Sequence, residues 1–290
     1  MNEGIYVGLS FAEYAAIKAV NHSRLGLMSL SPKHYQDPKP WLGRAGVVGN
    51  LIHTGATEAT TLAERYAVAD PWHLDQENTD KSGNPSKSKS TNYYRAKAAE
   101  FEKVNEGREI VSRDEYDTMR GVVKSIEADP LANKLINGPG KSEVTIVWED
   151  PETGILCKGR IDRLGDDYIA DIKSTVKLFE FERVIATHHY HRQQAFYRYG
   201  WSVLNGGELL DCYIVAVEKD PPFAVRSAPL SDAALDQGDR EWRRLLNRVA
   251  ECHESGCWPG PESPESWELP AWAVQDEPLT LTIGGSSVAI

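Results

Sequence analysis

The sequence VTIVWEDPETGILCKGRIDRLGDDYIADIKS, residues 144–174, contains three short apolar runs separated by two turns. The turns include DPETG and GDD, whose residue types favour tight reversals of the chain. Strands that follow one another this closely pair as antiparallel neighbours. The stretch therefore predicts a β-meander with strands at residues 144–148, 155–162 and 168–173, and we expect the rest of the chain to fold around it.

Charged side chains stand at the ends of the second and third predicted strands. Because side chains alternate along a strand, Asp171 and Lys173 share one face, and Asp162 shares a face with Lys158 and Arg160. A hairpin with so short a turn brings Asp162 close to Asp171. Two neighbouring carboxylates repel each other unless a cation lies between them, and Mg²⁺ suits such a site. The alternative is an exposed Asp171–Lys173 ion pair, which is worth ~0–1 kcal/mol.

Helical patterns lie on both sides of the meander. Residues 112–128 start with Ser112 and Glu115 at capping-box spacing, and their apolar residues recur at helical spacing. Residues 176–204 are predicted to be helical with a break near Thr187, and the apolar run 209–217 predicts a buried strand. Further helices are predicted at residues 10–20, 43–61, 92–104, 131–136 and 230–252.

Residues 76–92, QENTDKSGNPSKSKSTN, contain no apolar side chain and predict a flexible loop. The loop carries Lys81, Lys87 and Lys89, with Arg95 shortly after it. Two interpretations remain open at this point. The segment is either a solvated loop or a mobile basic loop that contacts a phosphate backbone.

The composition, with 41% hydrophobic and 26% charged residues, is that of an ordinary globular protein. No apolar run is long enough to span a bilayer and no secretory signal is recognisable, so we expect a cytoplasmic protein. The net charge of −11 is unusual for a nucleic-acid binder, although a local basic track beside an acidic metal site is compatible with it. The cysteines form no C-x-x-C pair, which favours reduced thiols.

Polar residues elsewhere in the chain have roles that spacing alone leaves open. His53 follows Gly49 by four residues, so both lie on one face of the predicted helix. A lone histidine in such a place is more often structural than a ligand. Gln193 and Tyr197 form a similar pair on the helix that follows Lys173.

The order of these motifs resembles the PD-(D/E)XK nucleases of the RecB type. More narrowly, it resembles the exonuclease VIII group, the RecE-type exonucleases of phage recombination. The shared order is G-x-x-x-H, E, G-R-I-D, D-I-K-S-T and Q-x-x-x-Y, followed by a closing LPAWA. In this sequence the motifs lie at residues 49–53, 143, 159–162, 171–175, 193–197 and 269–273.

The resemblance implies an α/β fold with a restriction-endonuclease-like core, in which a central mixed β-sheet is flanked by helices. It implies a single domain over residues 1–275, followed by a tail of unknown role at residues 276–290. It also implies phosphodiester hydrolysis that depends on Mg²⁺, with Mn²⁺ able to substitute. No iron–sulfur cluster is expected, because no cysteine precedes Cys157.

The resemblance also assigns roles to single residues. Metal ligands would be His53, Asp162, Asp171 and the backbone carbonyl of Ile172. The implied catalytic residues are Lys173, Asp162, Asp171, Glu143, Gln193 and Tyr197. Apart from the resemblance, positive charge suggests contact with DNA for Lys81, Lys87, Lys89, Arg160 and Arg192.

For the whole protein, the resemblance implies a 5′→3′ exonuclease that acts on ends of linear double-stranded DNA. The 3′ overhangs would serve a RecT-type single-strand annealing protein, and the enzyme would form a homo-oligomeric ring in the cytoplasm of a bacterial host, encoded by a phage or prophage. One alternative is a structure-specific or single-strand endonuclease with the same centre. The other is a nuclease-fold protein that binds DNA or a partner without cutting, and the intact set His53, Asp162, Asp171 and Lys173 weighs against it.

Overall fold

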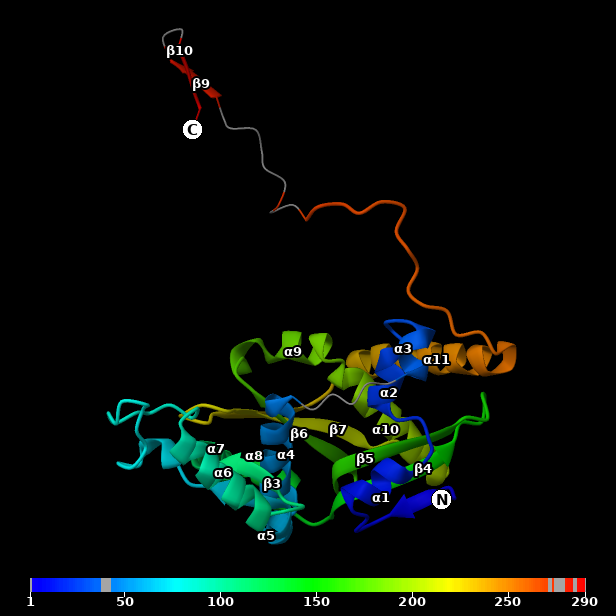
Figure 1. Cartoon of the computed structure of the whole chain (residues 1–290). Coiled ribbons are helices and arrows are strands. Elements are labelled where there is room, and N and C mark those ends of the chain that lie inside the picture. Colours follow the sequence, from blue (N-terminus) through cyan, green and yellow to red (C-terminus); the bar gives the residue numbers. More distant parts are fainter. Residues whose placement is uncertain (1, 38–42, 271–272, 274–279, 284–285, 290) are drawn as a thin grey trace.

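A mixed six-stranded sheet forms the centre of the protein in a computed structural model, which describes residues 2–37, 43–270, 273, 280–283 and 286–289 (Figure 1). The strand order is β1-β4-β5-β6-β7-β8, and only the pair β6–β7 is parallel. These strands are β1 (Gly4–Tyr6), β4 (Lys141–Glu149), β5 (Leu156–Leu164), β6 (Tyr168–Thr175), β7 (Asp211–Glu218) and β8 (Val225–Pro229). The predicted α/β class with a mixed central sheet is confirmed.

Helices cover both faces of the sheet (Figure 1). The N-terminal helices are α1 (Phe11–Ala16), α2 (His22–Leu27), α3 (Pro32–Gln36), α4 (Arg44–Thr57) and α5 (Leu62–Arg65). The others are α6 (Asn92–Val104), α7 (Arg113–Ala128), α8 (Pro130–Asn137), α9 (Phe181–Thr187), α10 (Tyr190–Leu204) and α11 (Asp232–Ser255). Short 3₁₀ turns lie at η1 (Ala59–Thr61), η2 (Trp72–Leu74) and η3 (Leu178–Glu180).

The core is divided between the two faces of the sheet. On one face α4, α7 and α8 pack on β6 and β7, where Ile52 and Met119 meet Ala170 and Ile172. On the other face α2, α10 and α11 pack on β4 and β5 in a cluster that includes Trp148, Phe196 and Trp242. The alternation predicted for the third meander strand is thereby confirmed, since Ala170 and Ile172 face one layer and Ile169 faces the other.

The parallel pair β6–β7 explains where α9 and α10 lie. Parallel neighbours need a long crossover connection, and here the crossover runs through η3, α9 and α10. The predicted break near Thr187 is confirmed, because α9 ends there and α10 begins at Tyr190. Gly200 allows α10 to pack closely on β4, because an added Cβ at this position would come within 2.6 Å of the Trp148 ring.

The structure extends the predicted meander and adds elements that the pattern did not reveal. All three predicted strands are present with shifted bounds, and β1 and β8 extend the sheet at its two edges. A separate parallel pair joins β2 (Tyr66–Ala69) to β3 (Glu109–Ser112), and β9 (Thr280–Ile283) pairs with β10 (Ser286–Ala289). Residues 271–272 of the LPAWA motif and residues 276–279, 284–285 and 290 of the tail lie outside the described residues. Within the described part of the chain, no helix is long and apolar enough to cross a bilayer.

The loop at residues 76–92 lacks helix and strand but has internal contacts. Asn78 is fully buried, and its side-chain amide donates hydrogen bonds to the backbone carbonyls of His73, Ser86 and Ser88. These hydrogen bonds hold the loop at Asn78, and its flexibility elsewhere stays a prediction. Its exposed side chains include Lys81, Lys87 and Lys89.

Candidate metal centre

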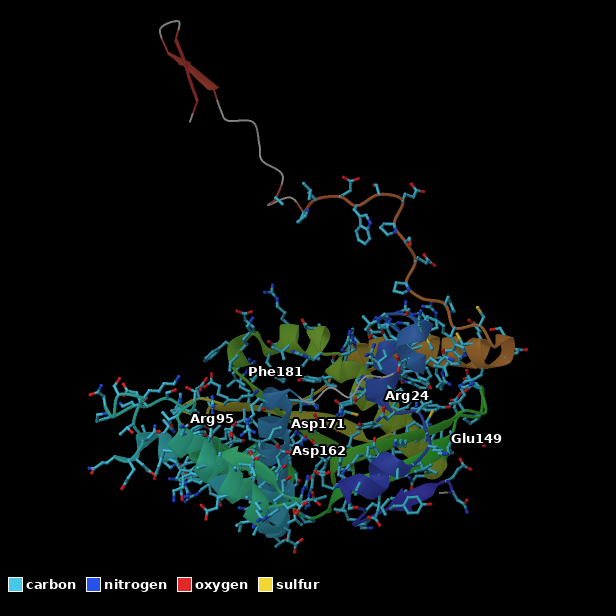
Figure 2. All side chains as sticks on the ribbon, in the orientation of Figure 1. Arg24, Arg95, Glu149, Asp162, Asp171 and Phe181 are labelled. Atoms are coloured by element: carbon cyan, nitrogen blue, oxygen red, sulfur yellow. The ribbon has the colours of Figure 1, made fainter. Side chains whose placement is uncertain are left out.

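The site forms where β5 and β6 separate. Their ladder pairs Arg163 with Ala170 and Leu164 with Ile169 and goes no further, so Asp162 and Asp171 lie just beyond its last rung (Figure 2). The backbone N–H of Ile172 donates to Asp162 Oδ2 at 3.0 Å. Because the N–H and C=O of one strand residue point to the same edge, the Ile172 carbonyl also faces this gap.

Helix α4 brings a histidine to the gap. His53 Nδ1 lies 3.0 Å from Asp162 Oδ2, and the two side chains are 26% and 12% exposed. His53 and Asp162 are far apart in sequence, and the packing of α4 against β6 on one face of the sheet joins them. The predicted partnership of these two residues is thus present in the fold.

Glu143 reaches the same place through an unusual backbone conformation. Its φ of 53° lies in the left-handed region, which costs energy in a residue with a side chain. With this conformation inside β4, its carboxylate lies within 4.8 Å of the ligand atoms of His53 and Asp162. Thr57 Oγ1 donates to Glu143 Oε1 at 3.0 Å, and Arg160 Nε donates to the other oxygen. Glu143 is therefore part of the centre.

Asp171 stands slightly apart and pairs with Lys173. The Lys173 ammonium lies 2.6 Å from Asp171 Oδ2, and both side chains are largely buried, at 14% and 3% exposure. The pair lacks hydrogen-bond alignment, so the buried Asp171 Oδ2 has no hydrogen-bond partner. Tyr190 of α10 places its ring 4.6 Å from the same ammonium. Lys173 is thus fixed between a carboxylate and an aromatic face.

The pKa shifts of the site residues reflect several carboxylates crowded at the gap between β5 and β6. Burial raises the pKa of Asp171 to about 6, although Lys173 acts in the opposite direction. Burial disfavours the charge on His53, yet the Asp162 carboxylate outweighs this effect and raises the pKa of His53 to about 9. Burial disfavours the charge on Lys173 as well, and Asp171 and Asp162 still hold the pKa of this ammonium above its usual value. His53 and Lys173 together offset part of the negative charge.

The predicted pair on α10 lies behind this centre. Tyr197 is buried, and Gln193 Nε2 donates to its hydroxyl at 3.3 Å. A Cβ at Gly159 would come within 2.7 Å of the Tyr197 ring, so the glycine of the G-R-I-D motif allows α10 to approach β5. Tyr197 therefore supports Gln193 and packs the helix instead of facing a ligand.

A model of the family described as a PDDEXK-like domain of unknown function (DUF3799) matches residues 29–266. The chain belongs to this family. The matched segment contains every residue of the PDDEXK-like centre described above, from His53 to Tyr197. The broad PD-(D/E)XK resemblance is thereby confirmed, whereas the narrower RecB-type and exonuclease VIII likeness stays a prediction.

One solved structure has a fold similar to that of this chain. A "Putative exonuclease" from Eubacterium rectale is 14% identical, with a TM-score of 0.57, and the match covers 88% of this chain and 90% of that chain. At this identity the likeness shows the fold alone. A second structure, SSO0001, is 13% identical over 75% of this chain and 98% of that chain, and its TM-score of 0.27 carries no argument. No curated protein matches the sequence.

The PDDEXK-like centre fits a hard divalent cation. Mg²⁺ and Mn²⁺ prefer oxygen ligands, which the three carboxylates and the Ile172 carbonyl supply, and neighbouring ligands of an octahedral ion with bonds of about 2.1 Å lie about 3.0 Å apart. The separation of His53 Nδ1 and Asp162 Oδ2, 3.0 Å, has this value. The buried Asp171 Oδ2 is paired with the Lys173 ammonium but lacks an aligned hydrogen bond, so it can still accept from, or bind, a cation. The residues that would hold the ion are therefore His53, Asp162, Glu143 and Asp171, with the Ile172 carbonyl.

Two of the basic residues predicted to contact DNA are engaged inside the protein. Arg192 is 4% exposed, and its Nε donates to His22 Nε2 at 3.2 Å. Arg160, besides its bond to Glu143, donates from Nη1 to the Leu9 carbonyl at 2.9 Å. DNA contact by these two side chains stays a prediction, and their burial, which was not visible in the sequence, does not favour it.

The motif spacing also missed two residues of the PDDEXK-like site. Tyr190 lies three residues before Gln193, so helical spacing could have placed it on the same face. Thr57 follows His53 by four residues and could have been found in the same way. Their contacts, with Lys173 and with Glu143, could not have been inferred without the fold.

Metal binding to this PDDEXK-like centre should depend on pH. An imidazole must lose its proton to bind a metal, and the pKa of His53 is raised to about 9. Below that pKa the proton competes with the metal, so affinity should increase as pH increases. Calorimetric titration with Mn²⁺ should show about 30-fold tighter binding at about pH 8 than at about pH 6.5. The factor follows because the metal displaces one proton, and the affinity then changes about tenfold per pH unit over about 1.5 units. His53→Asn should lose most of this dependence, and equal wild-type affinities at both pH values would contradict the assignment of His53.

Proposed function

We propose that this PDDEXK-like protein is a Mg²⁺-dependent exonuclease that degrades linear double-stranded DNA. The observation that carries the proposal is the placement of Lys173, paired with Asp171, beside the His53–Asp162 pair at the gap between β5 and β6. Carboxylates, an imidazole and a fixed ammonium at one partly buried place suit the cleavage of a phosphodiester. Hydrolysis puts negative charge on phosphate oxygens, and these cationic groups can stabilise it.

The residues of the chain have separate tasks in this reaction. When bound, Mg²⁺ would act as a Lewis acid on the phosphate and lower the pKa of a bound water. Lys173 keeps its proton because its pKa is raised, so it donates a hydrogen bond and does not act as a base. Its ammonium, held by Asp171 and Tyr190, can orient the attacking water or stabilise a phosphate oxygen. Gln193, supported by Tyr197, is available to bind DNA near the cut.

The exonuclease assignment, the 5′→3′ direction and the 3′ overhang rest on the order of the five motifs, which resembles RecE-type exonucleases. The name of the Eubacterium rectale protein supports the same reaction class. The ring-shaped homo-oligomer, the RecT-type annealing partner and a phage or prophage origin belong to the same proposal. Light scattering of the purified protein tests the ring, and a monomer at all concentrations would contradict it.

The choice of DNA ends can be tested with matched substrates. Linear duplex DNA should be degraded in Mg²⁺, whereas a covalently closed circle of the same sequence should stay intact because it offers no end. A label at the 5′ terminus should be released early, and a label at the 3′ terminus should remain in a long single strand. Nicking of the circle would show an endonuclease instead. Binding of linear DNA without cleavage in Mg²⁺ or Mn²⁺ would show a non-cutting protein.

A further inference from the structure

A second group of metal-ligating side chains lies where the start of α10 meets α11. His189 Nδ1 is 3.3 Å from Glu241 Oε2, and His191 Nε2 is 3.2 Å from Glu241 Oε1. The ligand atoms of these three residues all lie within 4.8 Å of one another. Side chains two apart do not normally share a helix face, and here the left-handed backbone of His189, with φ of 55°, makes the two histidines converge. The local strain thus serves to bring both imidazoles to one carboxylate.

The group is incomplete without a further partner. His189 Nδ1 and Glu241 Oε2 are buried atoms that face each other at 3.3 Å without an aligned hydrogen bond, and neither has another hydrogen-bond partner among the described residues. Glu241 Oε1 is satisfied, since Gln237 Nε2 donates to it at 3.0 Å. The nearest guanidinium nitrogen, Arg192 Nη1, lies 4.0 Å from Oε2, beyond hydrogen-bond distance. A cation between the two unpartnered atoms would satisfy both.

We propose that His189, His191 and Glu241 form a second cation site that binds Zn²⁺ or a similar transition metal. Zinc bonds to nitrogen and oxygen are about 2.0–2.2 Å, so neighbouring ligands in a tetrahedral site lie about 3.3 Å apart. The two His–Glu separations, 3.3 and 3.2 Å, are of this size, and they join the two imidazoles to different oxygens of the Glu241 carboxylate. Two imidazoles and one carboxylate leave a fourth position for water.

The character of the ligands favours zinc over magnesium at this place. Nitrogen donors suit Zn²⁺, whereas Mg²⁺ prefers carboxylates, carbonyls and water. The site shares no residue with the centre at His53 and Asp162. Its role is structural, because it clamps the start of α10, the helix that carries Tyr190 and Gln193, to α11.

The experiment measures zinc binding to the full chain in the Asp162→Asn background, which weakens the first centre. Isothermal titration with ZnCl₂ follows EDTA treatment and dialysis, and circular dichroism confirms that each variant is folded. His189→Asn removes the imidazole while keeping a residue that tolerates the left-handed backbone. Glu241→Gln removes the carboxylate charge and keeps its size. His188→Ala changes the exposed neighbouring histidine and serves as the matched control.

The His188→Ala protein should bind one more equivalent of Zn²⁺ than either the His189→Asn or the Glu241→Gln protein. Loss of a residue that only hydrogen-bonds to a metal ligand typically lowers metal affinity about 10–100-fold. Loss of a ligand itself should therefore weaken zinc binding at this site about 100-fold or more. The increase in melting temperature that Zn²⁺ produces should decrease in both variants. Equal zinc stoichiometry and affinity in His188→Ala and His189→Asn would overturn the proposal.

Discussion

Replacing Lys173 with methionine should lower the rate of DNA cleavage at least about 10³-fold. This is the effect expected when an enzyme loses a hydrogen-bond donor that stabilises the charge developing in the transition state. Methionine keeps the length of the side chain and its packing against Tyr190 but removes the ammonium. Cleavage of linear DNA under single-turnover conditions measures the effect. The loss should appear in the rate at saturating DNA, because the ammonium acts on the transition state.

The same substitution should leave the protein folded. Removing one partner of a buried ion pair usually costs about 3–5 kcal/mol, because a charge is left uncompensated. Here Asp171 already has a pKa raised to about 6, so it can take up a proton, or bind the metal, at a smaller cost. Lys177→Met, at an exposed position on the following loop, is the control. A Lys173→Met protein that cuts DNA within tenfold of the wild-type rate would show that the reaction centre lies elsewhere.

Replacing Asp162 with asparagine should remove the response of the protein to Mg²⁺. Asparagine keeps an oxygen that can accept from the Ile172 N–H, so the local backbone should persist. It removes the negative charge that faces His53, and the pKa of His53 should therefore fall. At about tenfold excess over its Kd, a bound ion stabilises a protein by about 1.4 kcal/mol. The melting temperature of the wild type should be higher in Mg²⁺ than in EDTA. The melting temperature of Asp162→Asn should be the same in both solutions.

The cleavage rate of Asp162→Asn should be about 10²-fold or more below that of the wild type at every Mg²⁺ concentration at which the protein stays soluble. The control is Asp167→Asn in the exposed turn between β5 and β6, which should respond to Mg²⁺ as the wild type does. A wild-type thermal response to Mg²⁺ in the Asp162→Asn protein would rule out this carboxylate as a ligand.

The meander was predictable because its signals are local. Apolar runs and turn residues define strands without knowledge of the rest of the fold, and Asp162 and Asp171 lie just beyond the end of the ladder that joins two of them. The positions of β1 and β8 were not predictable, since such short edge strands have no distinctive pattern. The helix α4 was predictable as a helix, but its contact with the meander was known only from the order of the motifs.

The sequence predicted which residues belong to the site better than it predicted how they are arranged. Sequence spacing could not show that Glu143 adopts a left-handed backbone and joins His53 and Asp162, because a positive φ there depends on the surrounding strands. It also could not separate a buried arginine from an exposed one, so the burial of Arg192 was not foreseen. Charge is visible in a sequence, whereas burial depends on which elements pack together.

The central claim is that the gap between β5 and β6 is a metal-dependent centre for DNA hydrolysis. The most direct measurement is the release of acid-soluble nucleotides from linear duplex DNA, by wild-type and Lys173→Met proteins side by side, with Mg²⁺ and with EDTA. We predict release by the wild type in Mg²⁺ alone, and at least about 10³-fold less by the variant. No release by the wild type in Mg²⁺ or Mn²⁺, or equal release by both proteins, would contradict the account.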